Sequence, residues 1–400
     1  MHVGLRSVVW SLVALLVSAA AIPAAAAVLN AHDFPTPQAA IDAAHDGDRI
    51  YLPAGTYMIP DSGLVVDKPL ELFGDGIGRG ESGTLLKPRA AGGNGNVIVI
   101  RSRGGAAPGY VTLRDLRIGP NGMPGTPGKG RGYGILLQQG AASRGTVQRL
   151  IVERIVISAM AADGIRIEGG DMGSNAVILS TLSDVQCIEC RGAGLVLRNG
   201  AVISVVRGYF NGNHRAGIDA EAVSSLRLDQ VAFQNDQNRP RVEDADLDAQ
   251  LRLKLCHAFN VLGCYFEEFA SPSPGTRRTA VVLENCRGGV LQGCYFTQPM
   301  YVPGSRGVLA TAGSSSITFG SNSYDQVAAT LELEDNEAAH SHVVFPQCAI
   351  RPVPSDSTAY ALRVGGRAAR DVLLLPPGTA ADPSPHYFDG IRWRKLGSGR

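Results

Sequence analysis

The sequence is poor in charged and aromatic residues, and neither sign of charge is in excess. Charged residues make up 18% of the 400 positions and aromatic residues 6%, while 37 Lys and Arg nearly balance 36 Asp and Glu. Because no net positive field is present, the composition does not favour a nucleic-acid-binding protein. A hydrophobic content of 44% argues against disorder. The 49 glycines favour short strands joined by tight turns over a helical bundle.

Beyond the amino terminus, long hydrophobic runs are also missing. No segment of that part of the sequence reaches the ~18 apolar residues of a membrane-spanning helix. The amino terminus itself has the pattern of a secretory signal peptide. Arg6 precedes an apolar stretch at 8–21, and four alanines follow at 24–27. We therefore expect residues 1–27 to be removed. The mature chain is then secreted or periplasmic, with no membrane span.

An internal repeat is the main feature of the sequence. A small or polar residue precedes a short apolar strand pattern at Gly134, Gly164, Gly194, Gly217, Gln250, Ala280 and Gly307. A second column follows in step, with Ile118, Ile157, Cys187, Phe210, Phe233, Phe266, Phe296 and Tyr324. Apolar and polar residues alternate within each unit, which indicates strands with one buried face. Stacking such units predicts an all-β, parallel β-helix with rungs ~4.8 Å apart, in which the aromatic column forms an internal ladder.

Both ends of the repeat region resemble caps, which a solenoid needs over its terminal rungs. Thr36 and Pro37 predict the start of a short helix, with Thr as the N-cap and Pro at the first helical position. At the far end, residues 386–393 predict a β-hairpin that turns at Asp389 and Gly390. We divide the mature chain into a β-helix domain at 28–345, with its cap at 28–48, and a C-terminal wrap and hairpin at 346–400.

Alternation also predicts which side chains of the first column point outward. Those with charge are Arg166, Glu168, Arg198, Asp219, Glu221, Arg252, Lys254 and Glu284. They concentrate on the middle rungs, while Leu136 and Leu309 are expected to be exposed on the outer rungs. The long segments 121–133, 234–249, 267–279 and 297–306 all enter the same sheet from one side. We expect them to form the wall of a groove, to which His214, Arg215, Arg239 and Arg241 contribute.

A family resemblance rests on the opening of the mature chain. Residues 46–57, Asp-Gly-Asp-Arg-Ile-Tyr-Leu-Pro-Ala-Gly-Thr-Tyr, are followed by Leu-Val-Val-Asp-Lys-Pro-Leu-Glu-Leu-Phe-Gly-Asp-Gly at 64–76. This opening resembles right-handed parallel β-helix proteins of the pectate-lyase-like superfamily. That superfamily contains polysaccharide lyases, glycoside hydrolases, uronate epimerases, phage tailspikes and non-enzymatic repeat proteins. The resemblance implies a right-handed coil and a polysaccharide partner, without choosing the reaction.

Two reactions fit the outward charges. β-Elimination on a uronate requires cations that neutralise the sugar carboxylate and a base that removes the neighbouring proton. Arg252, Lys254, Arg166 or Arg215 supply the charge, and Lys254, Arg252 or His214 the base. Hydrolysis instead requires two carboxylates, ~5–5.5 Å apart for retention or ~6.5–9.5 Å for inversion. Asp219 with Glu221, or Asp163 with Asp219, are the candidate pairs.

Comparison with hydrolase motifs of the superfamily favours elimination. Asp163 matches only the last residue of the Asn-x-Asp motif, and residues 191–194 lack the expected pair of aspartates. His214 lies near the position of the motif histidine, and Arg252-Leu-Lys254 matches Arg-x-Lys. We therefore take Asp163, His214, Asp219, Arg252 and Lys254 as candidate catalytic residues. The candidate substrate-binding residues are Arg166, Glu168, Arg198, Arg215, Glu221, Arg239 and Arg241. The alternatives are a glycoside hydrolase or uronate epimerase on the same fold, or a non-catalytic glycan-binding or cell-envelope scaffold, whose outward charges are cross-strand ion pairs.

Cysteines and acidic clusters suggest no resident cofactor. Cys256 and Cys286 are 30 positions apart, as are Cys264 and Cys294, so each pair occupies equivalent places on successive rungs. Buried thiols are expected there, with disulfides as the alternative in an exported chain. Cys187 and Cys190 lack the second ligand pair of a zinc site. The acidic residues Glu243, Asp244, Asp246 and Asp248 offer oxygen ligands for calcium, although a solvated turn is the preferred interpretation.

Overall fold

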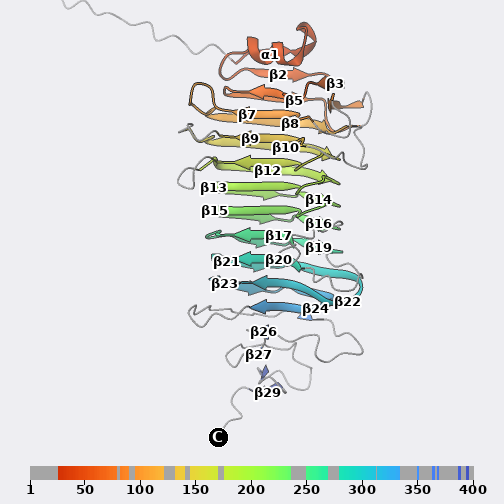
Figure 1. Ribbon diagram of the computed structural model, residues 1–400, viewed down its shortest axis with the longest axis vertical. Coiled ribbons are helices and arrows are strands. Elements are labelled where there is room, and N and C mark those ends of the chain that lie inside the picture. Colours follow the sequence, from red (N-terminus) through yellow and green to blue (C-terminus); the bar gives the residue numbers. More distant parts are fainter. Residues whose placement is uncertain are drawn as a thin grey trace, which may run out of the picture.

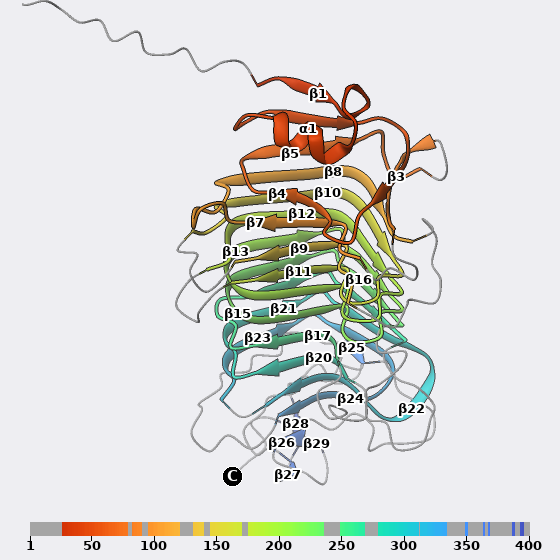
Figure 2. The same ribbon diagram turned by 45° about the horizontal axis from the view of Figure 1, so that its top comes forward.

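The structure is a computed structural model, and it shows a solenoid whose rungs stack along one long axis (Figure 1). It describes residues 26–78, 82–89, 95–120, 131–139, 145–169, 175–235, 249–268, 279–311 and 313–333, with five short strands beyond residue 348. Twenty-seven strands join in one hydrogen-bonded sheet, and successive rungs pair in parallel. The sheet bends at each corner of the coil, which divides it into three faces (Figure 2).

Each face is a ladder of parallel strands, one from each rung. The first face contains β4 (Leu64–Val66), β7 (Ile98–Arg101), β9 (Ile135–Gln138), β11 (Ile165–Glu168), β17 (Ala249–Lys254), β20 (Thr279–Glu284) and parts of β13 (Leu195–Val206), β15 (Ile218–Asp229), β22 (Tyr295–Ala310) and β24 (Ser323–Leu333). The second contains β1 (Val28–Asn30), β2 (Arg49–Leu52), β5 (Leu70–Gly74), β18 (Asn260–Leu262), β21 (Arg287–Gln292), β23 (Ser315–Gly320) and parts of β8 (Tyr110–Ile118), β10 (Arg149–Ser158), β12 (Val177–Ile188), β13 and β15. The third contains β3 (Gly55–Ile59), β6 (Thr84–Pro88), β14 (Tyr209–Asn211), β16 (Ala232–Gln234), β19 (Tyr265–Glu267), β25 (Ala349–Ile350) and parts of β8, β10, β12, β22 and β24.

The two ends of the chain agree with the expected caps. The helix α1 (Pro37–Ala43) follows the 3-10 turn η1 (Ala31–Asp33), and Thr36 accepts a hydrogen bond from the Ala39 amide at 3.1 Å. The helix ends at Ala43, before the stop that the sequence predicted at Asp46-Gly47, and the sequence did not indicate that the buried Lys68 ammonium donates to the carbonyls of Ile41, Asp42 and Ala44 there. In the C-terminal part, β26 (Arg363–Val364) and β27 (Arg367–Ala368) are antiparallel, and β28 (His386–Phe388) forms the predicted hairpin with β29 (Trp393–Lys395).

The predicted aromatic ladder lies inside the coil on the third face. Phe210, Phe233, Phe266, Phe296 and Tyr324 lie one above the other, and all five side chains are buried. Ring centroids are 5.7 Å apart for the first pair and then 4.8, 4.8 and 4.7 Å, with interplanar angles of 1° to 8° in the last three. Parallel in-register strands impose this spacing, because equivalent side chains follow the rung repeat.

The six cysteines of the described ranges are buried thiols that form no disulfide, so the interpretation as packed thiols is confirmed for them and the disulfide alternative is wrong. Cys348 lies outside the described residues. None of the helices in the described ranges is long and apolar enough to cross a membrane.

Corners of the coil are made by single residues in the left-handed backbone region. One column of such residues separates the second face from the third: Asp115, Arg154, Asp184 and Arg207 have φ between 50° and 59°. Gly263 and Gly293 continue the column, with φ of 57° and 66°. Residues other than Gly, Asn and Asp rarely adopt this conformation, so Arg154 and Arg207 in it are unexpected from sequence.

A candidate polysaccharide-binding strip

Two outward columns of the first face carry the charged residues that alternation predicted. Backbone pairing aligns Arg166, Val196, Asp219, Arg252 and Val282 in one column, and Glu168, Arg198, Glu221, Lys254 and Glu284 in the next. We call the eight charged residues of these columns the charged strip. The central prediction, that residues from different rungs share one outer face, is confirmed for all of them.

At the N-terminal end of the strip, Arg166 binds two carboxylates of its own rung. It donates to Asp163 at 2.8 Å and also to Glu168, and its guanidinium carbon lies 5.8 Å from the centre of the Tyr133 ring. Partial burial disfavours the charged form of Arg166. The hydrogen bonds that Arg166 donates to Glu168 and Asp163 outweigh this effect of burial and raise its pKa. The guanidinium is therefore a fixed cation.

In the middle of the strip, Arg198 joins two neighbouring rungs. It bonds the carboxylate of Asp219 at 2.6 Å and the Asp219 carbonyl at 2.8 Å, and it lies 3.6 Å from the carboxylate of Glu221. The ammonium of Lys254 contacts the same Glu221 at 2.8 Å. These contacts form one continuous chain of alternating charge across β13, β15 and β17.

On the next rungs, Arg252 pairs with Glu284 through two hydrogen bonds from its Nε and Nη2 atoms. Burial again opposes the charged form, and the bond to Glu284 raises the pKa of Arg252 overall. Arg252 therefore supplies permanent positive charge beside Asp219. A guanidinium held this way is suited to neutralising an anionic ligand and poorly suited to accepting a proton.

The strip is only half exposed, which corrects part of the sequence analysis. Asp219 is 4% exposed, and the outward residues Leu136 and Leu309, expected to be in solvent, are buried at 7% and 2%. Val196 packs with Ala193 and Ala216, and Val282 with Ala249 and Leu309, in two small apolar clusters outside the main core. Alternation fixes the direction of a side chain, but what covers that side chain depends on neighbouring segments.

Asp163 and the candidates in the adjacent turn have other surroundings. The buried Asp163 accepts a hydrogen bond from the Ala193 amide at 2.8 Å, and a Cβ on Gly192 would lie 2.0 Å from its Oδ1 atom. This contact ties two successive turns together and gives Asp163 a structural role. His214 and Arg215 lie in the half-buried turn before β15, and the amide of His214 donates to the Cys190 carbonyl at 2.9 Å.

The predicted groove wall differs from the structure at one segment. Residues 297–306 are not a turn; they belong to β22, which pairs with β24 through two register shifts. Arg239 and Arg241 lie outside the described residues, as does the acidic cluster at 243–248. Within the described ranges, no group of three or more His, Cys, Asp or Glu side chains is placed to hold a metal ion.

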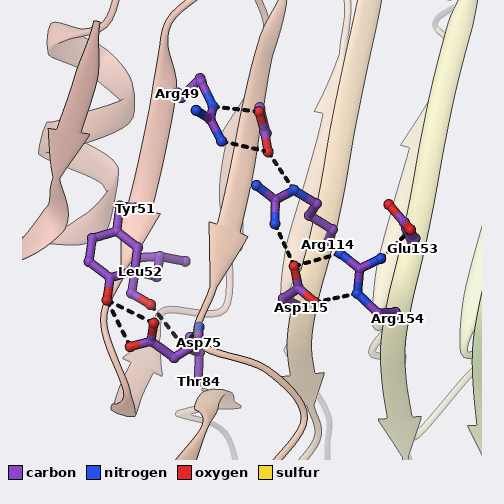
Figure 3. A network of polar contacts seen from close by, with 10 residues as sticks. Arg49, Tyr51, Leu52, Asp75, Thr84, Arg114, Asp115, Glu153 and Arg154 are labelled. Atoms are coloured by element: carbon purple, nitrogen blue, oxygen red, sulfur yellow. Dashed lines mark hydrogen bonds and ion pairs between the residues drawn. The ribbon is translucent and has the colours of Figure 1, made fainter.

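A second charged network, which the sequence analysis missed, lies on the N-terminal rungs of the second face (Figure 3). Glu71 on β5 accepts from Arg49 on β2 at 2.6 Å and from Arg114 on β8 at 2.5 Å. Arg114 continues to Asp115, which Arg154 on β10 binds in turn through two hydrogen bonds. The network crosses four rungs and therefore links the N-terminal cap to the body of the coil.

Aromatic residues support this network. Phe73 lies between the guanidinium groups of Arg49 and Arg114, whose central carbons are 4.8 and 4.7 Å from its ring centre. Tyr51 stacks on Phe73 at 5.2 Å and donates its hydroxyl hydrogen to Asp75. Carboxylates pair with all three arginines, and the cation–π contacts with Phe73 further stabilise Arg49 and Arg114. The arrangement indicates a stabilising element rather than an open binding site.

Comparisons with known proteins agree with the architecture. No protein-family model matches the chain, and no curated protein matches it in sequence. Among solved structures, ORF18 of Geobacillus virus E2 is 13% identical, with 90% of this chain and 68% of that one covered and a TM-score of 0.53. The chain is a right-handed parallel β-helix. Other similar structures are the mannuronan C-5 epimerase AlgE4 A-module of Azotobacter vinelandii (16% identity, 83% and 99% coverage, TM-score 0.47) and the alginate lyase of Paenibacillus sp. (10%, 84% and 97%, 0.46). At these identities the likeness concerns the fold alone.

Proposed function

We propose that the protein is exported and binds an extended, acidic polysaccharide along the charged strip. The observation that supports this most directly is the register of the strip, which places charged side chains on five consecutive rungs of one face. Rungs repeat every ~4.8 Å, so the strip is long and narrow, and its shape matches a linear polymer better than a small molecule.

Arginine chemistry supports an acidic sugar. Arg166 and Arg252 are kept charged by their carboxylate partners, and Arg198 contributes a third guanidinium between them. Planar guanidinium groups recognise carboxylates through paired N–H donors. Strip carboxylates such as Glu221 accept hydrogen bonds from sugar hydroxyls. A uronate polymer presents both kinds of group at regular intervals.

For the reaction, we propose β-elimination at Arg252 and Lys254. Arg252 neutralises the uronate carboxylate, which acidifies the neighbouring C5–H bond. The Lys254 side chain, which is 37% exposed and the most open of the strip cations, first releases its ammonium proton to water, and the resulting amine takes the C5 proton. The C–H electrons form the C4–C5 double bond, the C4–O bond breaks, and the leaving oxygen takes a proton from water.

Binding without catalysis is the second candidate. The observation that favours it is that Arg166, Arg198, Arg252 and Lys254 each pair with a strip carboxylate. Such pairs stabilise a partly solvated sheet modestly and need no further function. Hydrolysis or epimerisation fits less well, because Asp163 is occupied in a turn contact and Asp219 by Arg198.

The test combines binding and product analysis. Purified protein is titrated with polygalacturonate, alginate and hyaluronate, while ultraviolet absorbance reports unsaturated ends and a colorimetric assay reports new reducing ends. Variants Arg252→Ala and Lys254→Ala, on β17, are compared with Arg227→Ala, an exposed arginine in the second-face part of β15.

Each result has a defined meaning. Binding lost in Arg252→Ala but kept in Arg227→Ala supports the strip as the binding site. Unsaturated ends that disappear in Lys254→Ala support elimination. Binding without formation of unsaturated ends supports the scaffold function and excludes the lyase reaction. New reducing ends without ultraviolet absorbance from unsaturated ends indicate hydrolysis. If no uronate polymer binds, the proposed function is wrong.

A further inference from the structure

The third face carries a second polar surface, on the outside of the aromatic ladder. Tyr209, Tyr265 and Tyr295 belong to one outward column of this face, because β14, β16, β19 and β22 pair in register. In Figure 1, β14, β16 and β19 follow one another down one side of the coil. Tyr295 is 37% exposed, and the rings of Tyr265 and Tyr295 are 5.7 Å apart and tilted by 31°.

Hydrogen-bonding side chains form the next column, two residues further along each strand. Asn211, Gln234, Glu267, Thr297 and Asp325 occupy it on successive rungs. Residues i and i+2 of a strand point to the same side. Rungs β14, β19 and β22 therefore each present one aromatic ring beside one amide, carboxylate or hydroxyl group.

Contacts within this surface orient the polar groups. Tyr209 donates to the Gln234 side-chain oxygen at 2.7 Å, and the Tyr295 hydroxyl lies 3.4 Å from a carboxylate oxygen of Asp325. Partial burial raises the pKa of Tyr265, and the negative charge of the nearby Glu267 raises it further. The Tyr265 hydroxyl therefore remains a hydrogen-bond donor at neutral pH.

We infer that this tyrosine surface is a separate binding site for a neutral oligosaccharide. Pyranose rings have a C–H face that stacks on an aromatic ring and a rim of hydroxyls that pair with amides and carboxylates. The polar element recurs on every rung from β14 to β24, and the aromatic element on β14, β19 and β22, with Ala232 in its place on β16. The tyrosine surface also differs in charge from the strip: from β12 to β24, its two columns contain Glu267 and Asp325 but no Lys or Arg among the described residues. This surface therefore disfavours polyanions.

The inference is independent of the strip and is tested with different ligands. Cellohexaose, laminarihexaose and maltohexaose are titrated calorimetrically against the full protein, with a galacturonate hexamer as the acidic probe. We expect at least one neutral hexasaccharide to bind. Tyr265→Ala and Tyr295→Ala are expected to weaken it about tenfold, which corresponds to about 1.4 kcal/mol. Tyr295→Phe, which keeps the ring, should retain most of the affinity.

Two control variants separate this site from other surfaces. Tyr110→Ala removes a tyrosine of similar exposure, 42%, that lies on the second face, and Lys254→Ala alters the strip. Both are expected to leave binding of the neutral sugar unchanged. Thermal melting of each variant checks that it is folded.

Several results would overturn the inference. They are the absence of binding by all three neutral hexasaccharides, unchanged affinity in a Tyr265→Ala/Tyr295→Ala double variant, or loss of affinity in Lys254→Ala. Tighter binding of the galacturonate hexamer than of the neutral sugars at the tyrosines would also contradict it. None of these outcomes decides whether the strip binds uronate polymers.

Discussion

Phe266 is the side chain whose removal should destabilise the coil most clearly. It is fully buried and stacks on Phe233 and Phe296, each at 4.8 Å. Core Phe-to-Ala changes cost about 3–5 kcal/mol. An aromatic pair contributes about 0.5–1.5 kcal/mol beyond the burial of its area, and this ring belongs to two pairs. We therefore expect Phe266→Ala to lower the free energy of unfolding by a value near the upper end of that range.

Urea denaturation followed by circular dichroism measures this change. Tyr265→Ala is the matched control, because the neighbouring ring points outward and its loss should cost no more than about 1 kcal/mol. Phe266→Leu keeps most of the side-chain volume. It should lower the free energy of unfolding by about 1.5 kcal/mol or less, in addition to the loss of the aromatic stacking. Equal destabilisation by Phe266→Ala and Tyr265→Ala would refute the argument that the internal ladder supports the fold.

Two further predictions concern packing and pH. A Cβ on Gly289 would lie 2.0 Å from the Phe259 ring. Gly289→Ala should therefore lower the free energy of unfolding by about 1–3 kcal/mol in the same assay. Gly109→Ala, with open space at its Cβ, should change stability by no more than about 0.5 kcal/mol. Burial alone would raise the pKa of Glu71, but its two arginine partners lower it below the ordinary 4.5. Between that value and the lowered pKa, the unfolded chain binds a proton that the folded one does not, so stability falls as pH decreases. Glu71→Gln should be less stable at neutral pH and show a shallower acid decline in unfolding free energy; an unchanged slope would contradict the ion-pair account.

The fold was accessible from sequence because rungs leave periodic traces. Phe210, Phe233, Phe266 and Phe296 recur where one internal position must be filled on every turn of the coil. Outward directions of strip residues followed from the same periodicity. Burial did not, because Asp219 faces outward and is still covered. Neighbouring segments decide the exposure of an outward side chain, and strand alternation carries no information about them.

Other features lack a sequence pattern altogether. The network around Glu71 begins on β2 and β5, which precede the recognisable repeat, so no column of equivalent positions revealed it. The left-handed corners at Arg154 and Arg207 were equally hidden, since glycine or asparagine usually marks such positions. Segment 297–306 is a long connection between repeated strand patterns, which favoured a turn, yet it belongs to β22 and pairs with β24 through two register shifts.

Strand pairing also makes the positions of aligned residues independent of the length of the connection between them. Val196 and Asp219 are adjacent on the first face although 23 positions apart in the chain, and Asp219 and Arg252 are equally adjacent across 33 positions. Ten additional residues in the second connection therefore leave the alignment of the columns unchanged. An insertion between β16 and β17 therefore lengthens that connection without moving Asp219 relative to Arg252, so the chain between these strands can vary in length while the charged columns keep their register.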